Sequence, residues 1–135
     1  MFNQLKEVVM RDQKYRIWNK KGNYFFYYTL KELWEVESPA TIPFEYLEFL
    51  EYTGLKDKNG KEIYEGDVVK AIFYNHNYPN TEIIQVVSFE NGTYTLKSED
   101  VEFEIDRRNV PIFYADIIEV IGNIYENLEL LEDKK

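Results

Sequence analysis

The sequence contains no cysteine and a single histidine, His76. Disulfide bonds and thiolate metal sites are therefore excluded, and the redox compartment is left undetermined. A lone histidine rarely forms a transition-metal site, so we interpret His76 as a surface loop residue and expect no metal and no cofactor. The motifs of phosphate-binding loops, nucleophile elbows and zinc proteases are also missing. We therefore predict a protein that is not an enzyme and has no catalytic residues.

Long hydrophobic runs and positive charge are scarce as well. No apolar stretch approaches the roughly 20 residues of a membrane-spanning helix, and the N-terminus lacks the apolar segment of a secretory signal. We therefore expect a cytoplasmic protein that does not enter a membrane. With 16 Lys and Arg against 25 Asp and Glu, the net charge is -9. A field of this sign disfavours binding to nucleic acids and to anionic membranes.

Aromatic residues, in contrast, are abundant: they make up 17% of the chain, with twelve Tyr and nine Phe. Aromatic side chains favour β-strands and provide large contact areas in cores and at interfaces. The composition therefore predicts a mainly β fold.

Two segments of the chain have the sequence pattern of a β-hairpin. Residues 14–30 read as a β-hairpin with a charged turn around Gly22, and residues 82–97 read as a second hairpin closed by Asn91-Gly92. Residues 44–52 fit either a helix or a helical turn that leads into a strand, because their apolar positions match both periods.

The second half of the chain reads as a small barrel. About five strands, one of them at residues 101–105, follow Tyr64 without a helix-sized crossover, which suits an antiparallel SH3-like barrel. We therefore predict an N-terminal hairpin-and-helix lobe at residues 1–52, an SH3-like barrel at residues 53–122 and a C-terminal tail at residues 123–135.

The stretch from Tyr52 to Val69 contains the densest set of turn signals. Asn59-Gly60 favours a type I′ hairpin turn with two residues at positive φ. Asp67 is expected to accept backbone N–H groups and to fix a bend. Residues 57–62 resemble part of a calcium-binding loop, but the further ligands that such a loop needs are missing. The residues expected to have structural roles at turns are Gly54, Asn59, Gly60, Gly66, Asp67 and Gly122.

The same stretch resembles the hallmark segment of the YopX family of phage and prophage proteins, and the segment 119–127 resembles the family's second signature. Leu128 stands where family members usually have a proline after the final asparagine. The resemblance implies an SH3-type barrel and a protein encoded by a phage or prophage. It implies no catalytic residue, because the family has no established activity. In the central stretch the match rests on Tyr52, Thr53, Gly54, Leu55, Asp57, Gly60, Ile63, Tyr64, Gly66 and Asp67.

The run from Tyr24 to Tyr28 places aromatic side chains on both faces of a strand. A strand with one solvent-facing side would alternate aromatic and polar residues. We therefore predict that Tyr24, Phe26 and Tyr28 form an interface and that the protein is a homo-oligomer. The predicted function is that of a self-associating protein-interaction module with a further, unknown protein partner.

The alternative function is a nucleic-acid-binding accessory factor that uses the predicted barrel. Lys14, Arg16, Lys20 and Lys21 are interleaved with aromatic residues, a combination that stacks on single strands in other proteins. In the competing interpretation these cations pair with acidic groups of the protein, and the net charge favours that interpretation.

Overall fold

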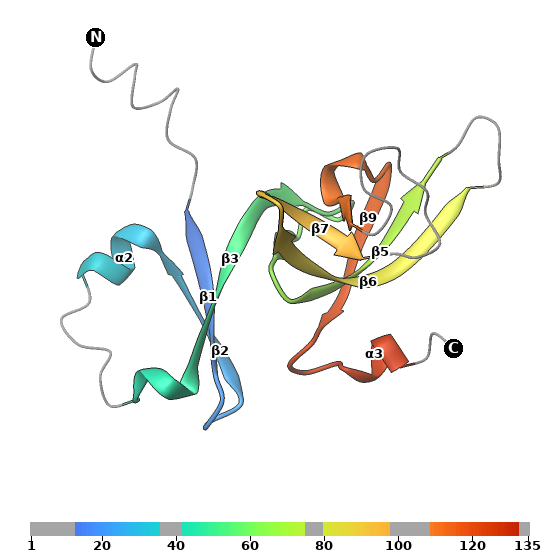
Figure 1. Cartoon of the computed structure of the whole chain (residues 1–135). Coiled ribbons are helices and arrows are strands. Elements are labelled where there is room, and N and C mark those ends of the chain that lie inside the picture. The colour runs from blue at the N-terminus through green and yellow to red at the C-terminus, as the bar shows by residue number, and fades with distance from the viewer. Residues whose placement is uncertain (1–12, 36–41, 75–79, 98–108, 133–135) are drawn as a thin grey trace, which may run out of the picture. The chain divides into compact units, whose positions relative to one another are not determined.

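The computed structural model describes residues 13–35, 42–74, 80–97 and 109–132 of the chain. Within these ranges the protein is mainly β, with two antiparallel sheets and a few short helices (Figure 1). The predicted fold class is thus confirmed. The chain divides into two compact units, Met1–Gly54 and Leu55–Lys135. None of the helices in the described ranges is long and apolar enough to span a membrane.

The first unit is built around strand β1 (Lys14–Asn19). β1 pairs antiparallel with β2 (Tyr24–Thr29) on one side and with β3 (Leu47–Lys56) on the other. The hairpin predicted for this part of the chain is therefore confirmed. Asn19 fixes its turn, because the side-chain oxygen of this residue accepts two backbone N–H groups of the turn at 2.9 and 3.2 Å.

Strand β2 ends where helix α2 (Leu30–Glu35) begins, and Thr29 and Glu32 cap the helix reciprocally. The Thr29 N–H donates to Glu32 Oε1 at 3.0 Å, and the Glu32 N–H donates to Thr29 Oγ1 at 3.1 Å. This capping box satisfies backbone donors that have no partner inside the helix. The hydrogen bond from the Thr29 backbone also holds the pKa of Glu32 below its ordinary value, because it favours the ionised carboxylate.

Only the first part of the stretch 44–52 is helical. η1 (Phe44–Tyr46) is a short 3-10 turn, and the chain then extends as the ten-residue strand β3. Of the two structures predicted here, the helical turn that leads into a strand is confirmed. Pairing with β1, in which Arg16 lies opposite Leu50, decides the outcome, because the local pattern fits both periods.

The second unit contains a five-stranded antiparallel sheet in the order β8-β7-β6-β5-β9, and the other sheet has the order β2-β1-β3-β4. β3 crosses from the first unit into the second. The remaining elements are β4 (Glu62–Tyr64), β5 (Asp67–Phe73), β6 (Thr81–Glu90), β7 (Thr93–Lys97), β8 (Asn109–Pro111), η2 (Ile112–Tyr114), β9 (Ile117–Asn123) and α3 (Glu129–Glu132).

The five-stranded sheet does not close on itself. β8 and β9 lie at its two edges, so the described strands form no closed barrel. The SH3-like barrel predicted for residues 53–122 is therefore not confirmed, although the sheet is antiparallel. Closure requires pairing between the two edge strands, and β8 and β9 do not pair in the described residues. The strand predicted at residues 101–105 lies outside the described residues.

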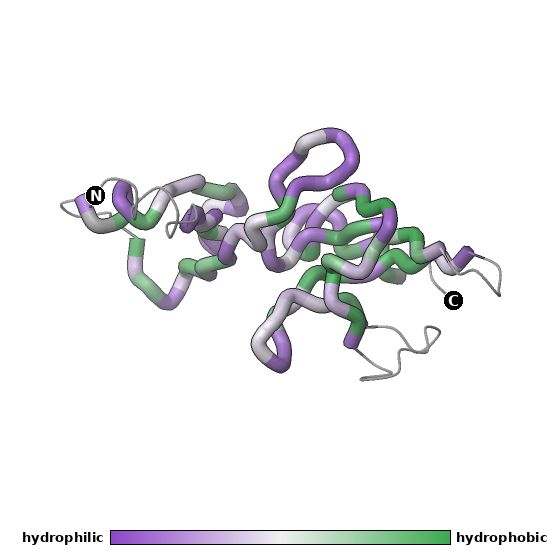
Figure 2. The backbone as a smooth tube through the Cα atoms, turned by 90° about the horizontal axis from the view of Figure 1, so that it is seen from above, coloured by the Kyte–Doolittle hydropathy of each residue, from purple (hydrophilic) through white to green (hydrophobic). Residues whose placement is uncertain are grey.

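The hydrophobic core of the second unit lies on one face of this sheet. Cross-strand pairs such as Ala71–Ile83 and Val87–Leu96 bring apolar side chains to the same face. Figure 2 shows hydrophobic stretches along the strands of this unit. The buried members of the core are Ile63, Val69, Ala71, Phe73, Ile83, Val87, Tyr94, Leu96, Val110 and Ile112.

Asp57 and Lys61 close a hairpin loop of three residues, 58–60. The prediction of a type I′ turn at Asn59-Gly60 is wrong. The Gly60 N–H donates to the Asp57 carbonyl oxygen at 2.9 Å, and the Asp57 N–H donates to the Lys61 carbonyl oxygen at 2.8 Å. Gly60 lies at φ 81°, whereas Asn59 does not adopt a positive φ. A type I turn followed by a left-handed glycine has this pattern. The Asp57 carboxylate holds Asn59 in the turn by accepting its N–H at 2.9 Å.

The second predicted hairpin is confirmed, together with its turn. β6 and β7 pair from Val87–Leu96 to Glu90–Thr93, which leaves a two-residue loop. Asn91 lies at φ 54° and Gly92 at φ 80°. Positive φ at both central residues is what a type I′ turn requires.

The other predicted turn residues differ in what holds them. Gly54 and Gly66 lie at positive φ, but Gly122 does not. A Cβ on Gly122 would instead lie 2.7 Å from both Asn127 Oδ1 and Leu130 Cδ1, so this glycine allows a close approach of the C-terminal segment. Asp67 is almost completely buried, and its Oδ2 accepts the Tyr64 N–H at 2.8 Å across the bend.

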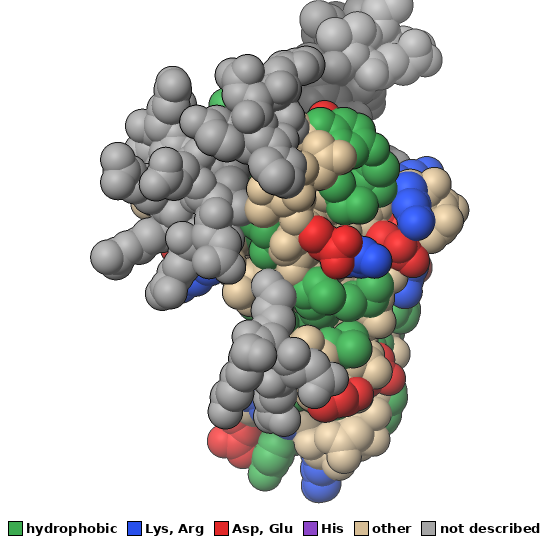
Figure 3. Space-filling model, turned by 90° about the vertical axis from the view of Figure 1, so that its right-hand side faces the viewer, with side chains coloured by type: hydrophobic (Ala, Val, Ile, Leu, Met, Phe, Trp, Pro, Cys, Tyr) green, Lys and Arg blue, Asp and Glu red, His purple; other side chains and the backbone are tan. Residues whose placement is uncertain are grey.

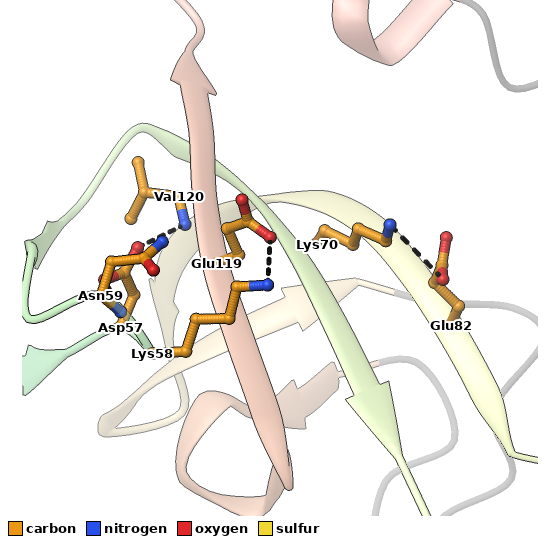
Figure 4. A network of polar contacts seen from close by, with 7 residues as sticks. All are labelled: Asp57, Lys58, Asn59, Lys70, Glu82, Glu119 and Val120. Carbon is orange, nitrogen blue, oxygen red and sulfur yellow. Dashed lines mark hydrogen bonds and ion pairs between the residues drawn. The ribbon is translucent and has the colours of Figure 1, made fainter.

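The Asp57 carboxylate also joins the 57–61 loop to strand β9, 63 residues further along the chain (Figure 4). Its Oδ1 accepts the N–H groups of Asn59 and Lys61, and its Oδ2 accepts the Val120 N–H, all at 2.9 Å. The Lys58 N–H donates to the Ile118 carbonyl oxygen at 2.9 Å. Burial by itself raises the pKa of Asp57, but the hydrogen bond from Val120 and the other N–H donors outweigh burial and hold this pKa below its ordinary value of 3.8.

We expect Gly60→Val to destabilise the protein by about 1–2 kcal/mol, because an L-residue at this φ is strained. Nothing lies within 4 Å of a Cβ placed at this position, so the cost is one of backbone strain alone. Denaturant unfolding measures the change. Lys56→Val, on an exposed position of β3, is the control and should have little effect. Equal stability of Gly60→Val and the parent protein would contradict the assigned turn.

We expect Asp57→Asn to lower the free energy of unfolding at pH 7 by about 1–3 kcal/mol, because an amide in place of the carboxylate cannot accept all three N–H donors. The folded-state pKa of Asp57 lies below the unfolded value of about 3.9, so its contribution is complete above that pH and is lost as the pH falls below it. The difference between parent and variant should therefore shrink in acid. A difference that stays constant from pH 7 to pH 2 would contradict this role of the carboxylate.

Candidate interaction surface

The three residues predicted to form an interface lie on one face of strand β2. In the register of the sheet Tyr24 lies opposite Asn19, Phe26 opposite Ile17 and Tyr28 opposite Tyr15. Paired residues of an antiparallel sheet project to the same side, so the sheet extends this face across β1. The rings also contact one another along the strand, with centroids 4.8 Å apart for Tyr24–Phe26 and 6.3 Å apart for Phe26–Tyr28.

Strand β3 and the turn η1 that precedes it each add one aromatic side chain to the same face. Phe49 lies opposite Ile17 across the β1–β3 pairing, and the ring of Phe44 stacks on the ring of Phe49 at 5.4 Å. Tyr24, Phe44 and Phe49 have exposed fractions of 44%, 74% and 41%, whereas Phe26 and Tyr28 are half-buried. We call Tyr24, Phe26, Tyr28, Phe44 and Phe49 the aromatic face.

The opposite side of the same strands is packed around Phe25. Arg16 and Trp18 are buried, and both contact Phe25: the Arg16 guanidinium lies 4.7 Å above the Phe25 ring, and the Trp18 ring centroid lies 4.7 Å from that of Phe25. Cation–π and ring contacts of this kind stabilise a buried arginine. Tyr27 is the exception on this side, with an exposed fraction of 60%. The aromatic run thus leaves one exposed ring on each side of β2, Tyr24 on the aromatic face and Tyr27 on the opposite side.

Sequence reasoning identified the members of the aromatic face on β2 but missed Phe44 and Phe49. As a helix, the stretch 44–52 would place these two residues on different sides, and this interpretation hid their relation. The strand interpretation could have identified Phe49, since in the period of a strand it lies on one side with Leu47 and Glu51. Only the register with β1 brings Phe49 next to the β2 aromatics.

Charge is distributed unequally between the two units. Residues 1–54 carry seven Lys and Arg against eight Asp and Glu, and residues 55–135 carry nine against seventeen. The first unit therefore has a net charge of -1 and the second a net charge of -8. The unit that carries the aromatic face is thus almost neutral.

The basic residues near the aromatic face already have contacts within the protein. Lys20 forms an ion pair with Glu48 at 3.2 Å, and the Lys21 Nζ lies 5.8 Å from the centre of the Tyr46 ring. In the second unit Lys58 pairs with Glu119 at 2.9 Å (Figure 4). Acidic and basic side chains also lie next to one another on the face shown in Figure 3. The ion pairs agree with the interpretation in which the cations pair with acidic groups of the protein.

Metal ligands do not cluster in the part of the chain that the structure describes, where no group of three His, Cys, Asp or Glu side chains is suited to hold an ion. His76 lies outside the described residues. Asp57 of the central stretch is engaged by three N–H groups of the protein itself.

Comparisons with known proteins place the chain among its relatives. The family model described as YopX protein matches residues 14–132. No curated protein matches the chain. Among solved structures, the crystal structure of protein EF1440 from Enterococcus faecalis is similar, with a TM-score of 0.52 and a sequence identity of 23%. The similarity covers 88% of this chain and 97% of that protein, and at this identity it concerns the fold alone.

We expect the purified protein to bind single-stranded DNA only weakly at about 150 mM salt, because few basic groups are available to displace counterions. Arg16 is only 4% exposed, and Lys20 is engaged by Glu48. Fluorescence anisotropy with a labelled oligonucleotide measures the affinity. Sub-micromolar binding that disappears in the triple variant Lys14→Glu, Lys20→Glu, Lys21→Glu would contradict this expectation.

Proposed function

The chain belongs to the YopX family, and from this premise we propose that it is a non-enzymatic, self-associating protein-interaction module of a phage or prophage. It acts in the cytoplasm of the host cell, and its first partner is a second copy of the same chain. The aromatic face on β2, η1 and β3 is the surface through which the two copies meet.

The observation that carries the proposal is the exposure of three large aromatic rings on one side of a small sheet. Tyr24, Phe44 and Phe49 together offer a wide apolar surface next to the half-buried rings of Phe26 and Tyr28. Contiguous exposed apolar surface of this kind is unusual in a monomeric protein and is typical of interaction sites. Tyrosine suits the rim of such a site, because its hydroxyl tolerates water while its ring contributes contact area.

A second copy fits this surface better than a strongly charged partner does. Strand β2 contains no charged residue, and the unit that carries it has a net charge of only -1. Two copies can therefore approach through this unit with little repulsion, while the acidic second units, each with a net charge of -8, repel one another. In a symmetric dimer the same patch contributes from both copies, so aromatic rings meet aromatic rings.

Binding to nucleic acid is the alternative function, and the surroundings of the basic residues speak against it. Arg16 is buried against Phe25, and Lys20 is held by Glu48. A strand of nucleic acid would have to displace these contacts and overcome the negative field of the protein before stacking on the exposed rings.

We expect the protein to be a dimer or a larger oligomer in solution, and we expect the triple variant Tyr24→Ser, Phe44→Ser, Phe49→Ser to be monomeric. A stable interface needs to bury about 1,000 Å² or more, and loss of three exposed rings removes most of the apolar area on this face. Size-exclusion chromatography with light scattering over a dilution series measures the mass. The substituted side chains are exposed, so circular dichroism and the melting temperature should change little.

The double variant Phe113→Ser, Tyr114→Ser is a matched control. Both rings are exposed, at 61% and 49%, but they lie on η2 in the second unit, so their loss should leave the oligomer intact. A monomeric mass of the parent protein at every concentration would refute self-association. An oligomer that survives in the triple variant, or that dissociates in the control, would place the interface elsewhere. Stoichiometric recovery of nucleic acid with the parent protein would favour the alternative function.

A further inference from the structure

We infer that the 57–61 loop is a cap on the outer edge of strand β9, and that release of this cap lets β9 pair with an edge strand of a second copy of the chain. β9 lies at one edge of the five-stranded sheet. The outer N–H and C=O groups of an edge strand are a template for pairing with another chain, and a covering loop prevents such pairing. This edge belongs to the second unit, so it is distinct from the aromatic face of the first unit.

The loop binds a donor and an acceptor on the outer side of β9. The Lys58 N–H donates to the Ile118 carbonyl oxygen at 2.9 Å. The Val120 N–H donates to Asp57 Oδ2, also at 2.9 Å (Figure 4). Because Ile118 and Val120 are two positions apart, their backbone groups face the same edge of the strand. A neighbouring strand would use these same groups, so the loop occupies the place of a further strand.

Other features also hinder pairing at the edges of this sheet. Glu119 lies between the two bonded residues of β9 and forms an ion pair with Lys58 of the loop at 2.9 Å. The register of β5 and β9 shifts between Val68 and Val69, as at a β-bulge. Charged side chains and bulges both protect edge strands. At the opposite edge β8 has only three residues and ends at Pro111, which lacks a backbone N–H.

The Asp57 carboxylate holds the cap closed. It is buried, and it accepts the N–H groups of Asn59 and Lys61 as well as that of Val120. Without the carboxylate the loop loses two of its internal hydrogen bonds, and the Val120 N–H loses its acceptor. A donor without an acceptor is costly, and a carbonyl oxygen of a second copy can replace the missing one. Since Ile118 and Val120 pack against the hydrophobic core, a strand added here would extend the sheet that carries the core.

Amide hydrogen exchange, followed by NMR, measures the cap directly. We expect the Val120 amide to be protected in the parent protein and to exchange about tenfold or more faster in the variant Asp57→Ala. The Leu96 amide, on a central strand, reports any loss of global stability, and the change at Val120 should exceed the change at Leu96. A Val120 amide that exchanges in the folded parent protein as fast as in an unfolded chain would overturn the inference.

The variants Lys58→Pro and Lys58→Ala separate the cap from the ion pair. Lys58 is the first central residue of a type I turn, a position that proline favours. Lys58→Pro removes the N–H that binds Ile118, whereas Lys58→Ala removes only the ion pair with Glu119. We expect Asp57→Ala and Lys58→Pro to form oligomers whose mass grows with concentration, and Lys58→Ala to form none.

Light scattering over a dilution series measures this mass. Each change is made in the background of Tyr24→Ser, Phe44→Ser, Phe49→Ser, and the mass is compared with that of this background alone. The outcome therefore does not depend on whether the aromatic face joins two copies. Val87→Ala, in the core and away from the loop, is the control for lost stability, with urea added to equalise the folded fraction.

The Lys58 variants decide between the cap and unspecific aggregation, also if Asp57→Ala does not fold. Growth of the mass in Lys58→Pro but not in Lys58→Ala or Val87→Ala would support the inference. The same mass in Lys58→Pro and Lys58→Ala, or oligomers of equal size in Val87→Ala, would overturn it.

Discussion

The hydrogen bonds that the Asp57 carboxylate accepts hold together the 57–61 loop and strand β9 of the second unit. The carboxylate accepts three backbone N–H groups, two from its own loop and one from β9. The loop follows β3, and β9 is an edge strand of the five-stranded sheet that pairs with β5. A single buried acceptor thus joins a local turn to a strand near the other end of the chain. Buried donors without such an acceptor are costly, which explains why a carboxylate occupies this position.

The two units use their apolar side chains in different ways. In the second unit the strands alternate, so that one face forms the core while cations and acids such as Lys70 and Glu82 pair on the other side (Figure 4). In the first unit aromatic residues occupy both sides of β2, and each side leaves one ring of this strand exposed, Tyr24 at 44% and Tyr27 at 60%. The near neutrality of this unit and its exposed rings suit contact with another chain. The strongly acidic second unit contributes solubility instead.

Local signals in the sequence were sufficient to predict a turn whose conformation depends on only one or two residues. Asn91-Gly92 correctly predicted the turn of its hairpin, in which both residues adopt the positive φ of a type I′ turn. Asn59-Gly60 has the same dipeptide but forms a different turn, because the Asp57 side chain holds Asn59 at negative φ. The predicted antiparallel strands are present, but the predicted closed barrel is not confirmed. Closure depends on pairing between the two edge strands and not on the number of strands.

The sequence by itself determined the mainly β class, both hairpins and the aromatic run on β2, because these follow from residue types and from spacing within a few positions. Only the tertiary structure decided that residues 47–56 form a strand and that Phe44 and Phe49 join Tyr24, Phe26 and Tyr28 on one face. Likewise, only the fold brings Asp57 to the N–H of Val120. The physical reason is the same in each case. Pairing between strands stabilises one local conformation over others whose free energies are almost equal when only neighbouring residues are considered.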